Sequence, residues 1–253
     1  MIDLHAHVLP GIDDGPKTLA DSLDLLRAAH ADGIARVAAT PHVREDYPTR
    51  PEEMERLLAE VREAARAEGI PIEVLPGGEI ALTQLAELED DDLRRFGLGG
   101  NPALLLLEFP YQGWPLALQE QAFRLAARGF TVVLAHPERS AEVQEEPTRL
   151  APLVEAGVLV QLTAASVDGR LGRRPQQCAR ALLDAGLAHV LASDAHAPAV
   201  RAAGLSAAAE ALDSPELARW LTDTVPRALL EGRELPPRPE RRRTRRLRAP
   251  WRA

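Results

Sequence analysis

The sequence begins MIDLHAHVLPGIDDG over residues 1–15. A short, largely apolar run over residues 1–4 is followed by two histidines, His5 and His7, that are one residue apart. Alternate side chains of an extended strand point to the same side, so the pair predicts a strand that ends in two neighbouring imidazoles. Such a pair is able to chelate a metal ion, and the rest of the chain tests this interpretation.

Short apolar runs alternate with helix-like stretches along the chain. The expected strands cover residues 1–4, 34–40, 72–76, 103–107, 131–135, 157–163 and 189–192. The expected helices cover residues 17–32, 51–68, 116–127, 175–185, 200–212 and 215–230. This alternation favours one α/β domain with about seven parallel strands in a distorted, closed or nearly closed (β/α) barrel. An open doubly wound sheet is the alternative, although no glycine-rich dinucleotide or phosphate-loop motif is present.

Charge is distributed unevenly along the sequence. Residues 233–253 hold nine arginines and two glutamates, a net charge of +7. The whole chain has a net charge of −8, so residues 1–232 carry −15. An acidic body argues against specific nucleic-acid binding. We expect a domain over residues 1–232 and a flexible, disordered Arg-rich tail over 233–253 that is able to touch an anionic surface or an acidic partner.

Compartment signals point to the cytoplasm. The single cysteine, Cys178, cannot form an intramolecular disulfide, which fits a reducing environment. No stretch approaches the roughly 20 apolar residues needed to cross a bilayer. The first residues lack the basic region of a signal peptide. We therefore expect a cytoplasmic protein.

Side chains that bind metal ions follow nearly every expected strand. They are His5, His7, His42, Glu79, Glu108, His136, Asp194 and His196, with Asp14 nearby. Because the carboxyl ends of parallel strands converge on one face of a barrel, we expect these side chains to meet there. Ionisable groups crowded at an apolar mouth repel one another or lose hydration unless positive charge lies among them, and divalent cations supply that charge.

This ligand set is too large for one ion, which takes about four to six ligands. It predicts two or three divalent metal ions, with Glu79 placed to bridge them. Imidazole and carboxylate without thiolate favour manganese, iron or zinc, with magnesium also compatible, over a structural thiolate zinc site.

Several motifs together resemble those of the polymerase-and-histidinol-phosphatase (PHP) superfamily of metal-dependent phosphoesterases. They are MIDLHAHVLPGIDDGPKT (1–18), ATPHV (39–43), GGEI (77–80), LLEFP (106–110), AHPER (135–139), TAASVDGRLG (163–172) and SDAH (193–196). Within this superfamily the chain resembles the bacterial protein-tyrosine phosphatases encoded with capsule and exopolysaccharide genes. The resemblance extends from residue 1 to about residue 230.

The resemblance implies a trinuclear site and assigns its ligands. One metal would be held by His5, His7, Glu79 and Asp194, a second by Glu79, Glu108 and His136, and a third by Asp14, His42 and His196. Arg139 and Arg201 match positions at which the family places arginines on the substrate phosphate, and they join Asp14 and His196 as the expected catalytic residues. The chain departs from many relatives at Val43, where they carry a second histidine, and in the more acidic segment REDYPTR (44–50).

We therefore expect a metal-dependent phosphomonoesterase that attacks phosphorus with metal-activated hydroxide. The resemblance favours a protein-tyrosine phosphatase whose partner is a phosphotyrosine protein or peptide, such as the phosphorylated tail of a bacterial tyrosine autokinase. Cys178 lies in no HCX5R loop, which argues against a cysteine-dependent phosphatase. The alternatives are a histidinol-phosphate phosphatase, a PHP-type nuclease and a non-catalytic binding module.

Overall fold

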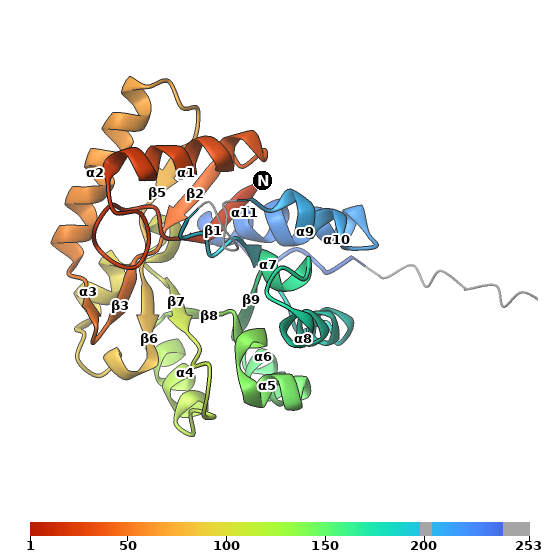
Figure 1. The fold of residues 1–253 in the computed structure, drawn as a ribbon. Coiled ribbons are helices and arrows are strands. Elements are labelled where there is room, and N and C mark those ends of the chain that lie inside the picture. Colours follow the sequence, from red (N-terminus) through yellow and green to blue (C-terminus); the bar gives the residue numbers. More distant parts are fainter. Residues whose placement is uncertain (198–203, 240–253) are drawn as a thin grey trace, which may run out of the picture.

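The computed structural model describes residues 1–197 and 204–239 (Figure 1). Its strands are β1 (Ile2–Ala6), β2 (Arg36–Ala39), β3 (His42–Arg44), β4 (Tyr47–Pro48), β5 (Glu73–Leu75), β6 (Glu79–Ala81), β7 (Leu104–Glu108), β8 (Thr131–Ala135), β9 (Leu159–Thr163) and β10 (Val190–Ala192). Each of the seven expected strand regions contains a strand. The short strands β3, β4 and β6 were not expected.

Parallel pairing joins the strands into two sheets. One sheet has the order β1–β2–β5 and the other has the order β10–β9–β8–β7–β6–β3–β4, in which only the β3–β4 pair is antiparallel. The sheets meet where Ala6 at the end of β1 forms an isolated parallel bridge with Ala195, just after β10. The parallel sheet of about seven strands is thus confirmed.

Within the described residues the strand ladder does not close into one continuous barrel, so the closed form of the expected closed or nearly closed barrel is not found. Two breaks separate the sheets. Pro41 interrupts the chain between β2 and β3 and has no N–H to donate to a ladder. Pro76 likewise has no N–H to donate, and together with Gly77 and Gly78 it separates β5 from β6. The strands therefore follow a barrel-like course that is consistent with a PHP-type fold.

Helices lie around the outside of the strands in Figure 1. The α-helices are α1 (Leu19–Ala31), α2 (Pro51–Ala67), α3 (Asp90–Arg95), α4 (Leu118–Ala127), α5 (Ala141–Glu145), α6 (Ala151–Glu155), α7 (Ala164–Val167), α8 (Arg173–Asp184), α9 (Ser206–Glu210), α10 (Pro215–Arg219) and α11 (Val225–Leu230). Short 3₁₀ turns are η1 (Leu82–Gln84), η2 (Leu98–Gly100), η3 (Pro137–Arg139) and η4 (Pro147–Leu150), and η5 (Trp220–Thr224) is a π-helical turn.

Local sequence explains where the long helices start. Thr18 and Asp21 form a capping box at the first turn of α1, with each side chain bound to the backbone N–H of the other residue. Pro51 occupies the first position of α2, where its missing N–H costs nothing. All five residues of β7 are buried, as expected of a strand covered on both faces. No helix of the described residues is long and apolar enough to span a membrane.

The C-terminal helices differ from the expected pair. Within residues 204–239, only Ser206–Glu210 is helical in the region of the first expected helix, and residues 200–203 lie outside the described part of the chain. The second expected helix is divided into α10, η5 and α11. Pro226 lacks the N–H that an α-helix would direct to Thr222, which explains the local change to π-helical bonding.

The described start of the expected tail, residues 233–239, lies against the domain. Arg238 donates to the backbone oxygens of Ala188 at 2.6 Å and Leu183 at 3.0 Å. The indole N–H of Trp220 donates to the oxygen of Pro236 at 3.0 Å. These contacts satisfy backbone oxygens at the end of α8 and just before β10, and the flexibility expected of the segment stays a prediction. Residues 240–253 lie outside the described part, so the rest of the tail stays a prediction.

Candidate metal centre

The carboxyl ends of the strands bring the nine predicted metal ligands together. They come from β1 and the loop after it (His5, His7, Asp14), from β3 (His42), β6 (Glu79) and β7 (Glu108), and from the segments after β8 (His136) and β10 (Asp194, His196). Eight of the nine are buried, and the side chain of Asp14 is 37% exposed. Side chains that are far apart in the sequence therefore share one largely buried cluster at one end of the barrel-like sheet.

Four donor atoms form the first ligand group. They are Nε2 of His5, Nε2 of His7, Oε2 of Glu79 and Oδ1 of Asp194. The two nitrogens are 3.3 Å apart, and each lies 3.4–3.6 Å from the two oxygens. In a tetrahedral site with metal–ligand bonds of about 2.0–2.2 Å, the ligand atoms are about 3.3–3.6 Å apart. These five distances suit ligands that share a divalent cation. Among the four residues, His5, His7 and Asp194 form one group of mutually close ligand atoms, whereas Glu79 groups with His5 and His136.

A second group surrounds Asp14. Its Oδ1 lies 3.3 Å from Nε2 of His42 and 3.2 Å from Nε2 of His196. The ring of His196 is stacked on that of His7, with centroids 3.7 Å apart, so the second group adjoins the first. His7 also belongs to this group of mutually close ligand atoms, and the other three members are those that the family resemblance assigned to one metal.

Glu79 lies at the centre of the cluster and is fully buried. Its Oε1 is 2.7 Å from Nε2 of His136, and its Oε2 is 2.8 Å from Nδ1 of His42. That Oε2 and the Nδ1 of His42 nevertheless form no hydrogen bond of normal geometry. A buried carboxylate oxygen without a hydrogen bond is costly, which is what a cation ligand would relieve. This position agrees with the bridging role predicted for Glu79.

The third expected group, Glu79 with Glu108 and His136, is divided. Among the described residues, Glu108 clusters with His42 and Glu79, whereas His136 clusters with His5 and Glu79. Arg44 explains the position of Glu108, because its Nη1 donates to Oε1 of Glu108 at 3.0 Å and holds this carboxylate on the β3 side. Nothing in the sequence pattern had singled out Arg44.

Backbone conformation marks two of these ligand positions. Among the described residues other than glycine, only His136 (φ 38°) and Asp194 (φ 52°) have positive φ angles. A positive φ is uncommon for residues with a side chain and costs free energy. Hydrogen bonding offsets part of this cost, because the N–H of Asp194 donates to the oxygen of His5 at 2.8 Å. The fold thus places conformational strain where the candidate ligands converge.

Two buried side chains orient the histidines by contacting the ring nitrogens that face away from the cluster. The sequence motifs indicated neither of them. Asp13 Oδ2 is 2.7 Å from Nδ1 of His7, and Gln161 Oε1 is 2.9 Å from Nδ1 of His5. Both contacts leave Nε2 of the histidine facing the cluster, as is usual for metal-binding histidines. Signals were available, because Asp13 is the neighbour of Asp14 and Gln161 is a polar residue inside the apolar strand β9.

Buried charges raise the pKa values of two histidines. Burial alone lowers the pKa of His5, but the carboxylates of Glu79 and Asp194 outweigh it and raise this pKa to about 9. Burial also opposes charge on His42, yet contacts with Asp14 and Glu79 raise its pKa to about 10. The carboxylates therefore favour positive charge at both positions, and either protons or divalent cations supply it.

The carboxylates respond in opposite ways. Burial disfavours the charge on Glu79, but His5 and the other histidines around it hold its pKa well below the usual range. The pKa of Glu108 is instead raised, first by burial and then by the charge of Glu79. A positive charge beside Glu108 would therefore favour its ionised form.

Arg139 lies beside the cluster at the end of η3. Its Nη1 donates to Oδ2 of Asp194 at 2.6 Å, and its guanidinium lies 4.6 Å from the ring centroid of Tyr111. The Tyr111 ring is stacked on that of His136, with centroids 5.6 Å apart, and Tyr111 is 41% exposed. Arg139 therefore lies beside the cluster, and its expected contact with the substrate phosphate stays a prediction. Arg201 lies outside the described residues, and its expected role stays a prediction.

Two other residues singled out in the sequence lie away from the cluster. Val43 follows the ligand His42 on β3, so its side chain points to the opposite side, where it is buried in the core. Cys178 is buried on α8, its Sγ donates to the oxygen of Val143, and burial raises the pKa of its thiol to about 12. A buried thiol with a raised pKa is a poor nucleophile.

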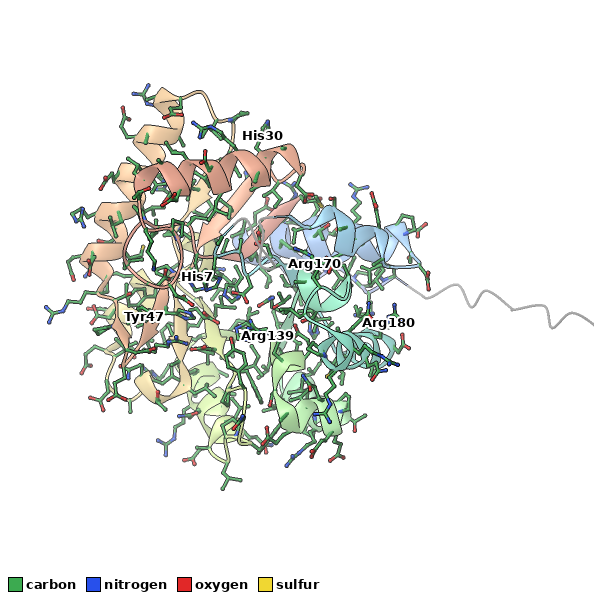
Figure 2. All side chains as sticks on the ribbon, in the orientation of Figure 1. His7, His30, Tyr47, Arg139, Arg170 and Arg180 are labelled. Carbon is green, nitrogen blue, oxygen red and sulfur yellow. The ribbon has the colours of Figure 1, made fainter. Side chains whose placement is uncertain are left out.

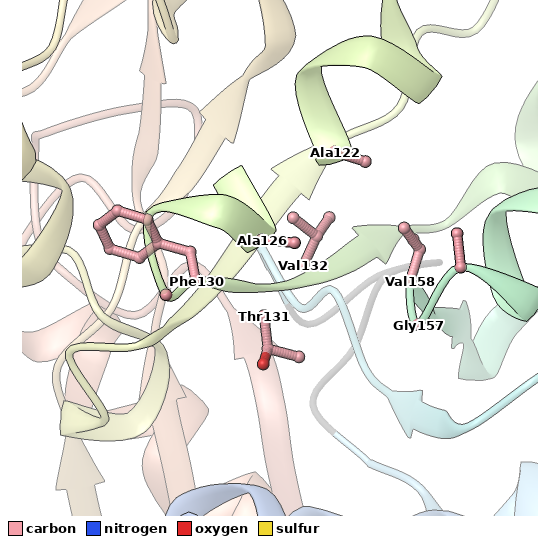
Figure 3. Close-up of a pocket in the computed structure, with 9 residues that line it drawn as sticks. Ala122, Ala126, Phe130, Thr131, Val132, Gly157 and Val158 are labelled. Carbon is pink, nitrogen blue, oxygen red and sulfur yellow. The ribbon is translucent and has the colours of Figure 1, made fainter. Parts of the chain in front are cut away.

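A pocket of about 370 Å³ lies elsewhere in the fold (Figure 3). Phe130, Thr131 and Val132 line it at the start of β8, and Gly157 and Val158 line it just before β9. These residues belong to the amino ends of the strands, whereas the ligand cluster lies at the carboxyl ends. The lining carries no ionisable side chain. This pocket is therefore separate from the candidate metal centre.

Comparison with known families agrees with this geometry. The family described as capsular polysaccharide synthesis, CpsB/CapC, matches residues 1–218. The chain belongs to the CpsB/CapC family. The tyrosine-protein phosphatase YwqE of Bacillus subtilis is 37% identical over 198 residues, which cover 78% of this chain and 77% of YwqE. The tyrosine-protein phosphatase CpsB of Streptococcus agalactiae serotype III is 28% identical over 202 residues, 78% of this chain and 83% of that protein.

Solved structures give the same result for this CpsB/CapC protein. One chain comes from the crystal structures of YwqE from Bacillus subtilis and CpsB from Streptococcus pneumoniae, described as unique metal-dependent tyrosine phosphatases. It matches with a TM-score of 0.86 and 34% identity, over 96% of this chain and all of that chain. The family resemblance inferred from the motifs is thus confirmed.

Proposed function

We propose that this CpsB/CapC protein is a metal-dependent protein-tyrosine phosphatase that acts in capsular or exopolysaccharide synthesis. The observation that carries the proposal is the first ligand group, in which the two imidazole nitrogens lie 3.3 Å apart and 3.4–3.6 Å from each of the two carboxylate oxygens. The names of its relatives supply the substrate class. A histidinol-phosphate phosphatase would use the same metals, and the family match favours the tyrosine phosphatase over it.

The nine ligands are proposed to hold two or three divalent cations, of which manganese is the first choice. His5, His7, Glu79 and Asp194 would hold one ion, and Asp14, His42 and His196 would hold another. Glu79 would bridge to the remaining ligands, Glu108 and His136. Cations bound there would lower the pKa of water from about 15.7 toward about 7, which provides a hydroxide nucleophile at neutral pH.

The residues of this chain bind the substrate and balance its charge. Arg139 is proposed to donate to the phosphate oxygens, since its guanidinium fork is already oriented by Asp194 and Tyr111. Asp14 and His196 are proposed to act at the exposed side of the cluster, where Asp14 is the most accessible ligand. A tyrosine leaving group has a pKa of about 10, so it departs with less proton donation than an aliphatic alcohol needs.

The proposed substrate is a phosphotyrosine protein, and a phosphorylated bacterial tyrosine kinase tail is the partner we favour. A cytoplasmic location is proposed together with it, because such a kinase tail would be met there. The Arg-rich segment after residue 233 is proposed to contact an anionic surface or an acidic partner.

The test compares two substrates on metal-stripped protein with and without added manganese. Phosphate release from a phosphotyrosine peptide, dependent on manganese and faster than release from histidinol phosphate, is the expected result. Release from histidinol phosphate alone would keep the metal centre but replace the proposed substrate. Release from both substrates without added metal would contradict the metal-dependent mechanism.

A further inference from the structure

Arg44 lies on the same side of β3 as the ligand His42, because the two residues are two positions apart in a strand. β3 pairs with β6 in the register His42 with Glu79 and Val43 with Ile80, so Arg44 follows one step toward the open end, beside Ala81. Ala81 in turn is paired with Glu108 of β7. The small side chain of Ala81 leaves room for Arg44 to reach across to Glu108.

Three contacts hold the Arg44 side chain in place. Its Nη1 donates to Glu108 Oε1 at 3.0 Å, its Nε is 2.8 Å from Asp46 Oδ1, and its guanidinium lies 5.2 Å from the ring centroid of Tyr47. The side chain is still 25% exposed. A guanidinium carries five N–H donors, so these contacts leave donors for an anion at the mouth of the cluster.

Arg44 repeats the arrangement around Arg139 on the other side of Glu79. Each arginine donates to a candidate ligand carboxylate and lies against a tyrosine ring. Each tyrosine is stacked on a candidate ligand histidine, Tyr47 on His42 and Tyr111 on His136, with interplanar angles of 18° and 20°. Both histidines lie within 2.8 Å of the Glu79 carboxylate. Figure 2 shows Tyr47 and Arg139 on two sides of His7.

We propose that Arg44 is a further phosphate-binding arginine, which contacts the substrate phosphate from the side opposite Arg139. The inference rests on the proposed phosphatase function and adds a contact to it. Two guanidinium groups on opposite sides suit a phosphomonoester, whose terminal oxygens carry two negative charges and are free of a second ester group.

The test uses the manganese-loaded protein with Arg44→Gln and Arg44→Lys. Gln keeps a donor for Glu108 but loses the charge, and Lys keeps the charge but loses the fork. The dissociation constant of inorganic phosphate, measured by calorimetry, is expected to rise about tenfold or more in Arg44→Gln and less in Arg44→Lys. Metal content per protein is expected to stay unchanged. Arg36→Gln is the matched control, because Arg36 pairs with Glu73 at the far end of β2.

Phosphate binding is measured without catalytic turnover, so this experiment tests the role of Arg44 independently of the proposed phosphatase activity. An unchanged dissociation constant in Arg44→Gln would overturn the inference. A loss of phosphate affinity that saturating manganese restores would also overturn the inference. Arg44 would then act only by positioning Glu108 as a metal ligand. Weaker phosphate binding at full metal content would support the inference, even if the wild-type protein released no phosphate from phosphotyrosine.

Discussion

Oδ2 of Asp13 lies 2.7 Å from Nδ1 of His7 and also accepts the backbone N–H of His42 at 3.1 Å. One carboxylate oxygen therefore fixes the ring of one candidate ligand and the backbone of another. The N–H of Gly15 donates to the other oxygen of Asp13 at 2.9 Å, which ties the loop after β1 to the same carboxylate. Asp13 is not one of the candidate ligands, yet it sets the position of two residues that are.

Replacing Asp13 with Ala is expected to weaken manganese binding by about 10- to 100-fold, the usual loss when a partner behind a ligating histidine is removed. His7 would then lose the contact that keeps Nε2 toward the cluster. Calorimetric titration of metal-stripped protein measures the effect. Asp24→Ala is the matched control, since Asp24 is an exposed residue on α1 that pairs with Arg27. Equal affinities in both variants would contradict the orienting role.

Chelation of the metal is expected to lower the melting temperature of the wild-type protein. A ligand that binds the folded state at about 100 times its dissociation constant stabilises it by about 2.7 kcal/mol. For a domain of this size each kcal/mol shifts the melting temperature by about 2–4 °C, so a fall of about 5–10 °C is expected. Differential scanning fluorimetry with and without a chelator checks it, and returned manganese should reverse the fall.

The variant Asp194→Asn serves as the comparison for chelation, because it removes one charge from the first ligand group without changing its size. The chelator is expected to shift its melting temperature less than that of the wild type. A shift of the same size in both proteins would show that the stabilising metal is bound elsewhere.

His189 is expected to make the protein less stable as pH falls from about 6.5 to about 4. Burial, and then the charge of Arg238, lower the pKa of His189 to about 4, whereas an unfolded histidine titrates near 6.5. In that window the unfolded chain binds more protons than the folded one, so stability decreases with decreasing pH, by up to about 3 kcal/mol from this residue.

The variant His189→Asn should flatten this part of the stability profile. Its amide oxygen is able to replace Nδ1 of His189, which accepts the N–H of Val160 at 3.1 Å, and it does not titrate. Urea unfolding at pH 4.5, 5.5 and 7 compares it with wild type. His30→Asn, on an exposed position of α1, is the control that should keep the wild-type slope. A slope unchanged in His189→Asn would rule out His189 as its source.

The clustering of the candidate ligands could be predicted from sequence because most of them follow expected strands, and the parallel pairing then brings the strand ends together. The course of the sheet could not be predicted, because the breaks at Pro41 and at Pro76 to Gly78 depend on how β3 and β6 pair locally. Gln161 and Arg44 were missed for a related reason. Their roles depend on contacts across strands with His5 and Glu108, and the spacing of residues along the chain does not indicate such contacts.

Tyr111 is expected to favour aryl over alkyl phosphates. Its ring contacts both His136 and Arg139 and is 41% exposed, so an aromatic leaving group bound at Arg139 would contact it. Aromatic pairs contribute about 0.5–1.5 kcal/mol beyond area burial, which predicts a loss of roughly 2- to 12-fold in preference. The quantity to measure is the ratio of kcat/KM for a phosphotyrosine peptide to that for a phosphoserine peptide.

Three variants separate this stacking role from a general loss of folding or charge. Tyr111→Phe keeps the ring and should keep the ratio, whereas Tyr111→Leu should lower it. Phe123→Leu is the matched control, because Phe123 on α4 is 74% exposed and touches no ring of the cluster. Burial raises the pKa of the Tyr111 phenol above its ordinary value, which makes it a poor proton donor. A ratio that falls equally in Tyr111→Phe and Tyr111→Leu would therefore assign the effect to the hydroxyl and reject the stacking role.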